Sequence, residues 1–327
     1  MAITKRLKSV SFITVLAVMV CLSVINSWGA DEEVKKTEGV KEIKYKSSAD
    51  NTMQPALFYS PGVAEKRPLL VSLHTWGSTY KTGVTDYRGD KLAIEKGWVF
   101  IHPNFRGANR RPEATGSELV VADIVSAVEY CKKNANVDED RIYLMGVSGG
   151  GFTALLMAGR EPDIWAGVSA WVPISDLKQW YIEHKKKGSH YANDVARSCG
   201  GDPTKDPKAE AEAVKRSPVT YLANAKNVPL DIHGGLSDNL VCFAQSLWAF
   251  NAVAQEKDRI PEEMIEAFVA TKRVPEGLKN EKKRGAVFSR QSGKVTVTIG
   301  RGGHGAVSIK RSVAWLELQK KTRKAKK

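Results

Sequence analysis

Ser148 has the surroundings of a serine nucleophile. It lies in the segment GVSGG (146–150), which fits the pattern G-x-S-x-G and stands between an apolar strand-like run and a helical pattern. In a turn of this kind the small flanking residues let strand and helix pass closely, and the serine hydroxyl stands above the sheet. A nucleotide-binding loop would need a lysine after the glycines, and Phe152 follows them here. We therefore predict that Ser148 is a nucleophile.

A nucleophilic serine needs a base and an acid, which follow such a turn in the order acid, then histidine. His304 is the natural base, because it lies in a glycine-rich loop after the last strand-like run. Asp238 lies in a turn after the run VPLDIH (228–233) and would hold the imidazole tautomer and stabilise the imidazolium. Asp231 is the rival acid, but it lies inside that run and would point into or across the sheet.

The negative oxygen of a tetrahedral intermediate requires two backbone N–H donors. One comes from the residue after the nucleophile, which is Gly149, and the other from a loop after an earlier strand. That loop is HTWGS (74–78), and the N–H of Trp76 is our choice within it. Thr75 stands where a glycine is common, so the local geometry is open.

Aromatic side chains near these segments are candidates for substrate binding. Trp76, Trp180 and Tyr181 are predicted to supply walls of an acyl or sugar site. Trp171 fits that role and a place in the core equally well.

Apolar runs alternate with helical patterns along the chain, which predicts an α/β fold with a mostly parallel sheet and helices on both faces. The runs are LLVSLH (69–74), WVFIHP (98–103), IYLMG (142–146), GVSAWVP (167–173), VPLDIH (228–233) and VTVTIG (295–300). Residues 43–58 are expected to form an antiparallel hairpin at the sheet edge. Residues 174–227 are polar and helical and are expected to form a lid-like insert, while 258–283 form a charged insertion and RQSGK (290–294) a turn.

The N-terminus has the layout of a signal peptide, with three cations, an apolar run from Val10 to Ile25 and small residues before Ala30. Cleavage before Ala30 is expected, and cleavage after it is nearly as good. We expect residues 1–29 to be the signal, 30–50 a leader, 51–320 the catalytic domain and 321–327 a basic tail. The protein would then be secreted or periplasmic, without stable membrane insertion.

The chain is strongly basic, with a formal net charge of +14. The last residues, KKTRKAKK, account for much of this and are typical of a solvated tail. No stripe of basic residues interleaved with aromatics is present, so we expect no nucleic-acid partner. No histidine or cysteine cluster has metal-ligand spacing, and neither a metal nor an organic cofactor is expected. Cys199 and Cys242 are candidates for a disulfide, and the sequence indicates no oligomeric state.

Taken together, the chain resembles the α/β-hydrolases of the prolyl oligopeptidase type over about residues 65–315. The stretches that carry the resemblance are HPNFRG (102–107), DIVSAVEYCKKN (123–134), VDEDRIYLMGVSGGG (137–151), RSPVTYL (216–222) and IHGGLSDNLV (232–241). The resemblance implies a catalytic serine at Ser148, an acid at Asp238 and a base at His304. Large peptidases of this type carry a β-propeller ahead of the catalytic domain, and we expect none in the short segment between residues 30 and 65. Stand-alone domains of similar sequence are often esterases that act on acetylated or feruloylated polysaccharides.

We therefore expect an exported serine hydrolase that cleaves a carboxylic ester through an acyl-enzyme, on an acylated carbohydrate or a small acyl substrate. A peptidase that acts on small peptides is the alternative, because the same three residues cleave amides when the histidine protonates the leaving amine. A catalytically inactive binding module is the third interpretation.

Overall fold

The computed structural model describes residues 37–82, 87–281 and 283–321. The chain divides into two units, Met1–Val34 and Lys35–Lys327, and the second contains every element described below. The expected signal peptide, the first residues of the leader and nearly all of the basic tail lie outside the described residues. None of the described helices is long and apolar enough to cross a membrane.

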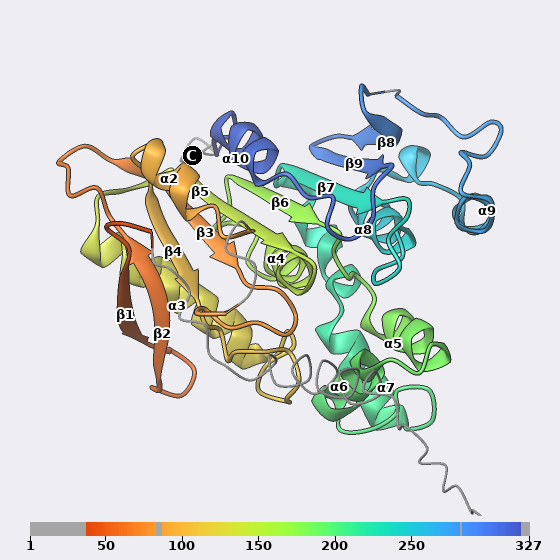
Figure 1. Ribbon diagram of the computed structural model, residues 1–327, viewed down its shortest axis with the longest axis horizontal. Coiled ribbons are helices and arrows are strands. Elements are labelled where there is room, and N and C mark those ends of the chain that lie inside the picture. Colours follow the sequence, from red (N-terminus) through yellow and green to blue (C-terminus); the bar gives the residue numbers. More distant parts are fainter. Residues whose placement is uncertain (1–36, 83–86, 282, 322–327) are drawn as a thin grey trace, which may run out of the picture. The chain divides into compact units, whose positions relative to one another are not determined.

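A nine-stranded mixed sheet forms the centre of the molecule (Figure 1). The strand order is β1-β2-β4-β3-β5-β6-β7-β9-β8, and the six strands from β4 to β9 in this order run parallel. The bounds are β1 Lys41–Lys46, β2 Met53–Tyr59, β3 Arg67–Leu73, β4 Val99–Pro103, β5 Val137–Val147, β6 Gly167–Trp171, β7 Leu230–Gly235, β8 Ala286–Ser292 and β9 Val295–Gly300. The predicted α/β fold is confirmed, and each predicted apolar run is a strand.

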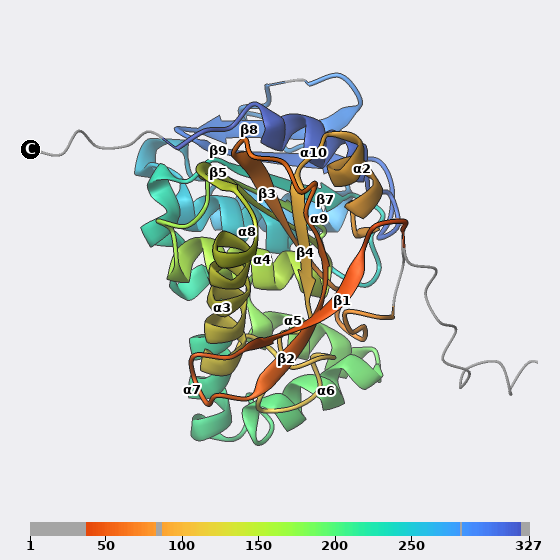
Figure 2. The same ribbon diagram turned by 90° about the vertical axis from the view of Figure 1, so that its left-hand side faces the viewer.

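Helices cover both faces of the sheet, as Figure 2 shows from the side of the β1–β2 hairpin. One face packs against α3 (Glu118–Asn134), α4 (Gly149–Arg160) and α8 (Ala244–Val253), and the other against α2 (Asp90–Glu95) and α10 (Ile309–Glu317). Alternate residues of β3 serve the two faces: Leu69 and Val71 join the larger apolar core, whereas Leu70 joins the smaller one. The continuous apolar runs in the sequence have this cause, because a strand covered on both sides buries every residue.

The sheet edges are antiparallel. Strands β1 and β2 form the expected hairpin, although β1 lies ahead of residue 51, where we expected the domain to begin. At the other edge, β8 and β9 form a hairpin whose turn is at Gly293, with φ of 53°. Part of RQSGK therefore belongs to β8, which the sequence did not predict. Between α8 and β8 the charged insertion holds a short 3-10 helix, η4 (Glu256–Asp258), and α9 (Glu262–Thr271).

The predicted insert folds as a separate helical group. It holds α5 (Leu177–Lys186), α6 (His190–Cys199) and α7 (Pro207–Arg216), followed by two 3-10 helices, η2 (Pro218–Thr220) and η3 (Leu222–Asn227). The side chains of Asp176, Ser189 and Asp206 accept hydrogen bonds from the first backbone N–H groups of α5, α6 and α7, which fixes where each helix begins. The three helices bury their own apolar cluster, which Trp76 and Phe152 join.

The disulfide that we considered is not formed. Cys131, Cys199 and Cys242 are free thiols. Cys199 is buried within the apolar cluster of the insert, whereas Cys242 packs against the main core. Burial raises the pKa of the Cys199 thiol to about 11, so this side chain behaves as a packed apolar group.

Candidate active site

Ser148 occupies a strained turn between β5 and α4. Its φ of 56° and ψ of −118° are angles that glycine adopts far more easily than a residue with a side chain. Its N–H donates to the carbonyl of Trp171 (2.8 Å), and a Cβ at residue 146 would lie 2.1 Å from the carbonyl oxygen of Gly150. Glycine at 146 therefore lets β5 and α4 pass closely enough to form the turn, and glycine at 150 lets α4 approach the end of β3, where a Cβ would lie 2.3 Å from the Leu73 carbonyl oxygen.

The three predicted catalytic residues follow the C-terminal ends of parallel strands. Ser148 follows β5, Asp238 follows β7 and His304 follows β9. The strand ends are in register through the pairs Val147–Trp171, Trp171–His233 and Gly235–Gly300. All three residues therefore leave the sheet at the same edge.

Asp238 and His304 form a hydrogen-bonded pair. The Nδ1–H of His304 donates to Oδ2 of Asp238 at 2.7 Å. The other carboxylate oxygen, Oδ1, accepts from the N–H groups of Leu240 (2.8 Å) and Val241 (2.9 Å). The Asp238 side chain is inaccessible, while 24% of the His304 side chain is exposed. The carboxylate is thus fully bonded, and Nε2 of the imidazole is left as the basic nitrogen.

Backbone contacts hold the loops of the acid and the base together. The N–H of Leu236 donates to the carbonyl of Gly300 (2.8 Å), and that of Ser237 to the carbonyl of Gly302 (3.1 Å). A Cβ at Gly235 would lie 2.7 Å from the oxygen of Gly302, so glycine is required for this approach. The 2.7 Å pair therefore rests on a main-chain framework rather than on flexible side chains.

Ser148 and His304 do not form a hydrogen bond within the part of the chain that the structure describes. Such contacts are often long in substrate-free enzymes and tighten when substrate binds. Ser148 is partly exposed, so its hydroxyl is accessible to a substrate.

The two predicted oxyanion donors lie side by side. A Cβ on Gly149 would lie 2.4 Å from the backbone nitrogen of Trp76. Among the described residues, neither of these N–H groups donates to another protein group. The Trp76 carbonyl accepts from the N–H of Asn109 (2.8 Å), which orients this peptide. Two free N–H groups at one point are what an oxyanion requires.

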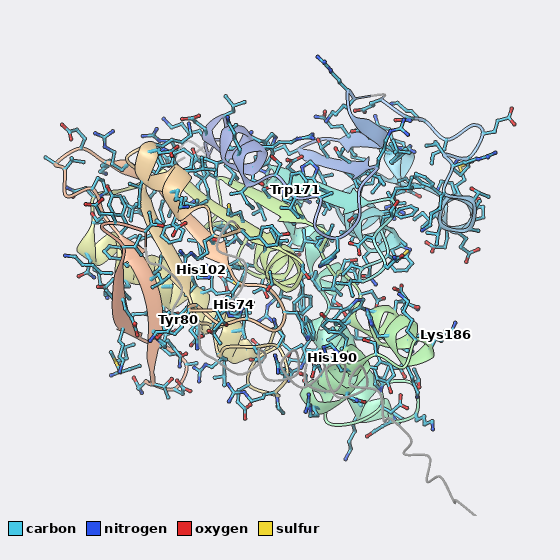
Figure 3. The ribbon with its side chains drawn as sticks, viewed as in Figure 1. His74, Tyr80, His102, Trp171, Lys186 and His190 are labelled. Carbon is cyan, nitrogen blue, oxygen red and sulfur yellow. The ribbon has the colours of Figure 1, made fainter. Side chains whose placement is uncertain are left out.

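A buried histidine supports the oxyanion loop from below. The His74 ring stacks on Phe105 with centroids 3.9 Å apart, and its two nitrogens contact the carbonyls of Thr75 and Asn104. Figure 3 labels the side chains of His74, which directly follows β3, and of His102 on the neighbouring strand β4, and their ring centroids are 6.3 Å apart. Burial lowers the pKa of both imidazoles, that of His102 to about 3, so both serve as neutral packing groups.

The aromatic residues that we predicted to bind substrate are buried. Trp76, Trp180 and Tyr181 have exposed fractions of 3%, 2% and 5%. They lie in the apolar cluster of the insert, and the rings of Trp76 and Trp180 are 4.5 Å apart. A substrate contact with these rings would require the insert to move, so their role in binding stays a prediction. Trp171 is a core residue, and its indole N–H donates to Oγ of Ser312 (2.6 Å).

Asp231, the rival acid, is paired with a different histidine. The Nε2–H of His233 donates to its Oδ2 at 2.6 Å, and both side chains are buried. The His233 ring stacks on Trp171, with centroids 3.9 Å apart. The sequence analysis missed this second pair, although the signal was present: residues two apart on a strand share one face.

The described residues contain no group of His, Cys, Asp and Glu side chains that could hold a metal ion. What the arrangement offers chemically is a strained, partly exposed serine, an acid–base pair and two unpaired N–H donors at one sheet edge. These are the components of nucleophilic acyl transfer.

The family model described as "Prolyl oligopeptidase family" matches residues 90–266. The chain is 30% identical over 185 residues to dipeptidyl-peptidase 5 of Porphyromonas gingivalis, a match that covers 54% of this chain and 26% of that protein. It is 25% identical over 186 residues to feruloyl esterase B of Neurospora crassa, which covers 55% of this chain and 61% of that protein. The chain thus spans less than two thirds of the length of either relative.

The fold is similar to that of the uncomplexed acylaminoacyl peptidase of Pyrococcus horikoshii. The TM-score is 0.58 at 19% sequence identity, over 81% of this chain and 37% of that chain. At this identity the likeness concerns the fold alone, and it agrees with the α/β-hydrolase architecture expected from the sequence.

Proposed function

Because this chain belongs to the prolyl oligopeptidase family, we propose that it is a serine hydrolase that cleaves carboxylic esters through an acyl-enzyme. The proposed substrate class is an acylated carbohydrate or a small acyl compound. Ser148 is the proposed nucleophile, His304 the base and Asp238 the acid. The observation that carries the proposal is the 2.7 Å hydrogen bond between Asp238 and His304, at the sheet edge where Ser148 lies in its strained turn.

The geometry supports a defined role for each side chain. The Asp238 carboxylate holds the proton of His304 on Nδ1, which leaves Nε2 to accept the proton of Ser148 as its oxygen attacks the carbonyl carbon. Nε2 then returns this proton to the leaving alcohol. Water, deprotonated by the same nitrogen, attacks the acyl-enzyme. The bond from the acyl carbon to Oγ of Ser148 then breaks, Nε2 gives its proton to Oγ, and the acid is released.

The N–H groups of Gly149 and Trp76 would stabilise the oxyanion that forms in each of the two steps. Gly149 is the first residue of α4, so its N–H also carries the positive end of the helix dipole. Loss of one oxyanion donor costs about 3 kcal/mol of barrier in well-studied hydrolases.

One comparison and one chemical argument support an ester substrate. The chain spans 61% of the feruloyl esterase but 26% of the dipeptidyl peptidase, so its similarity extends over a larger part of an esterase. Ester cleavage also demands less of His304, because an alkoxide leaves more readily than an amine, which must be protonated before it departs.

A direct comparison of substrates tests the proposal. The purified protein is assayed with a nitrophenyl ester, a feruloyl ester and an amino-acyl anilide, with the Ser148→Ala variant as the blank. We expect ester turnover that is lost in Ser148→Ala and exceeds anilide turnover. Anilide cleavage far above ester cleavage would overturn the ester assignment and leave the serine hydrolase intact.

A peptidase is the second candidate, and the 30% identity to a dipeptidyl peptidase favours it. A binding module without catalysis is the third, and labelling by a fluorophosphonate separates it from both enzymes. A chain whose Ser148 does not react with this probe under native conditions is not a serine hydrolase of the proposed mechanism.

Export and the domain boundaries belong to the same proposal. The layout of residues 1–29 supports a cleaved signal, followed by a leader, a catalytic domain that extends to residue 320 with its insert (174–227), and a basic tail (321–327). The leader is shorter than the expected 30–50, because β1 (Lys41–Lys46) pairs with β2 in the central sheet. N-terminal sequencing of the mature protein tests this, since a chain that still begins at Met1 would refute cleavage.

A further inference from the structure

The turn that carries Asp238 is held by the insert. The carbonyl oxygen of Leu240 accepts two hydrogen bonds from α5, from Nε1–H of Trp180 (3.0 Å) and from Nε2–H of His184 (2.8 Å). A third contact comes from the end of the same helix, where Nζ of Lys187 donates to the carbonyl of Asn239 (2.8 Å).

The peptide groups on both sides of Leu240 are also hydrogen-bonded to the acid, Asp238. The N–H groups of Leu240 and Val241 bind Oδ1 of Asp238, and the opposite oxygen binds His304. A shift of the Leu240 peptide therefore rotates the carboxylate and changes its approach to the imidazole. Helix α5 thus determines where the turn places Asp238.

The side chains of both donors are buried. Trp180 and His184 have exposed fractions of 2% and 1%. Nδ1 of His184 is buried without a hydrogen-bond partner among the described residues, so the proton lies on Nε2, where the Leu240 carbonyl accepts it. An unpaired buried nitrogen is costly, and leucine would fill the same space without it. The histidine is therefore explained by the bond that it makes to the acid turn.

Trp180 also contacts the other side of the site. Its ring lies 4.5 Å from the ring of Trp76, whose backbone N–H is the proposed second oxyanion donor. The Trp76 indole N–H in turn donates to Oδ2 of Asp194 on α6 (3.2 Å), a buried carboxylate that is also paired with Arg197. The insert therefore contacts both the acid turn and the oxyanion loop.

We propose that Trp180 and His184 are positioning residues for the hydrolysis: they fix the Asp238 turn through the Leu240 carbonyl, and Trp180 connects this turn to Trp76 in the oxyanion loop. This inference rests on the proposed function, since it takes Asp238 and Trp76 as parts of the catalytic site. It assigns the aromatic residues of the insert to the geometry of catalysis rather than to the wall of a substrate pocket.

The test removes the two donors separately and together. Trp180→Phe and His184→Leu each delete one hydrogen bond and keep an apolar side chain in place, and the double variant deletes both. His184→Gln restores a donor, because its amide nitrogen can take the place of Nε2. Trp165→Phe is the matched control: it loses a buried indole-to-carbonyl bond of similar length (3.1 Å, to Met157), on the segment that leads into β6 rather than on the insert.

Each variant is assayed with a nitrophenyl ester over a range of pH, and active enzyme is counted by fluorophosphonate titration so that unfolded material does not contribute. We expect kcat of the double variant to fall by about 10- to 100-fold with KM little changed. The acid limb of its kcat/KM profile should move to lower pH, since a displaced carboxylate stabilises the imidazolium less. His184→Gln should recover most of the His184→Leu loss, and Trp165→Phe should lose thermal stability alone.

Two results would overturn the inference. One is a double variant whose kcat and pH profile match those of Trp165→Phe, and the other is His184→Gln behaving like His184→Leu. Trp180→Phe is the mildest change and decides the question if the other variants do not fold. Its kcat should then fall below that of Trp165→Phe, and equal kcat values would overturn the inference. Failure of the proposed function is recognised separately: if Ser148 is not the nucleophile, Ser148→Ala in the otherwise unchanged protein retains ester turnover.

Discussion

The strained backbone of Ser148 makes an unusual stability prediction: Ser148→Gly should be more stable than Ser148→Ala. At φ 56° and ψ −118° a residue with a Cβ is strained, and glycine is not. The Ser148 side chain makes no hydrogen bond to the start of α4, so neither substitution removes a helix cap. Both keep the backbone bond from residue 148 to the Trp171 carbonyl.

The magnitude follows from two opposing contributions. Strain of this kind costs about 1–3 kcal/mol, which glycine relieves and alanine retains. Glycine loses about 0.4–1 kcal/mol more on folding, because its unfolded chain has greater conformational freedom. The difference should therefore be about 1 kcal/mol in favour of Ser148→Gly.

The measurement is urea unfolding of the two variants, extrapolated linearly to water, with m values compared to ensure a common transition. The control is Ala314→Gly, at an exposed position within α10, where glycine should cost about 1 kcal/mol. Ser148→Gly that proves less stable than Ser148→Ala, by an amount similar to the control, would refute the strain argument. Both Ser148 variants should lack esterase activity.

Three further predictions follow from close contacts and buried charge. Gly149→Ala should reduce kcat by at least about 100-fold, because its Cβ would lie 2.4 Å from the Trp76 nitrogen; an ester assay near wild-type rate would contradict this. Gly235→Ala should lower kcat and melting temperature together, since its Cβ would push the loop of the base away, and a change in KM alone would contradict it. Burial lowers the pKa of His102 to about 3, so the unfolded chain binds the proton first as pH falls below 6.5. From pH 6 to 5 this should remove about 1.2 kcal/mol of unfolding free energy, a contribution that is missing from the slope of His102→Asn and kept in that of the exposed His190→Asn.

The central sheet could be predicted because its strands are covered on both faces and read as continuous apolar runs. Strand β8 could not, since AVFSRQS at the sheet edge is no continuous apolar run: its second half is polar and carries a cation, Arg290. The chain order of nucleophile, acid and base identified Ser148, Asp238 and His304, and the structure brings the last two into contact. The roles of the three remain for the experiments above.

The burial of the aromatic side chains in the insert could not be predicted in the same way. Tryptophan is equally suited to a binding wall and to the core of a small helical cluster, so the type of Trp180 did not reveal its environment. The acceptor of its indole N–H is a main-chain carbonyl 60 residues away, and backbone carbonyls leave no mark in a sequence. The cysteines present a similar case: their number permits a disulfide, but the fold places Cys199 and Cys242 in different clusters.

The main-chain contacts between the loops of Asp238 and His304 have a consequence for divergence. The donors are the peptide N–H groups of Leu236 and Ser237 and the acceptors are the carbonyls of Gly300 and Gly302, so these contacts use atoms that every amino acid except proline shares. An exposed side chain beside them, such as that of Arg301, can vary without breaking these contacts. The rim of the site can therefore change its chemistry from one descendant to another, while the spacing between carboxylate and imidazole is inherited unaltered.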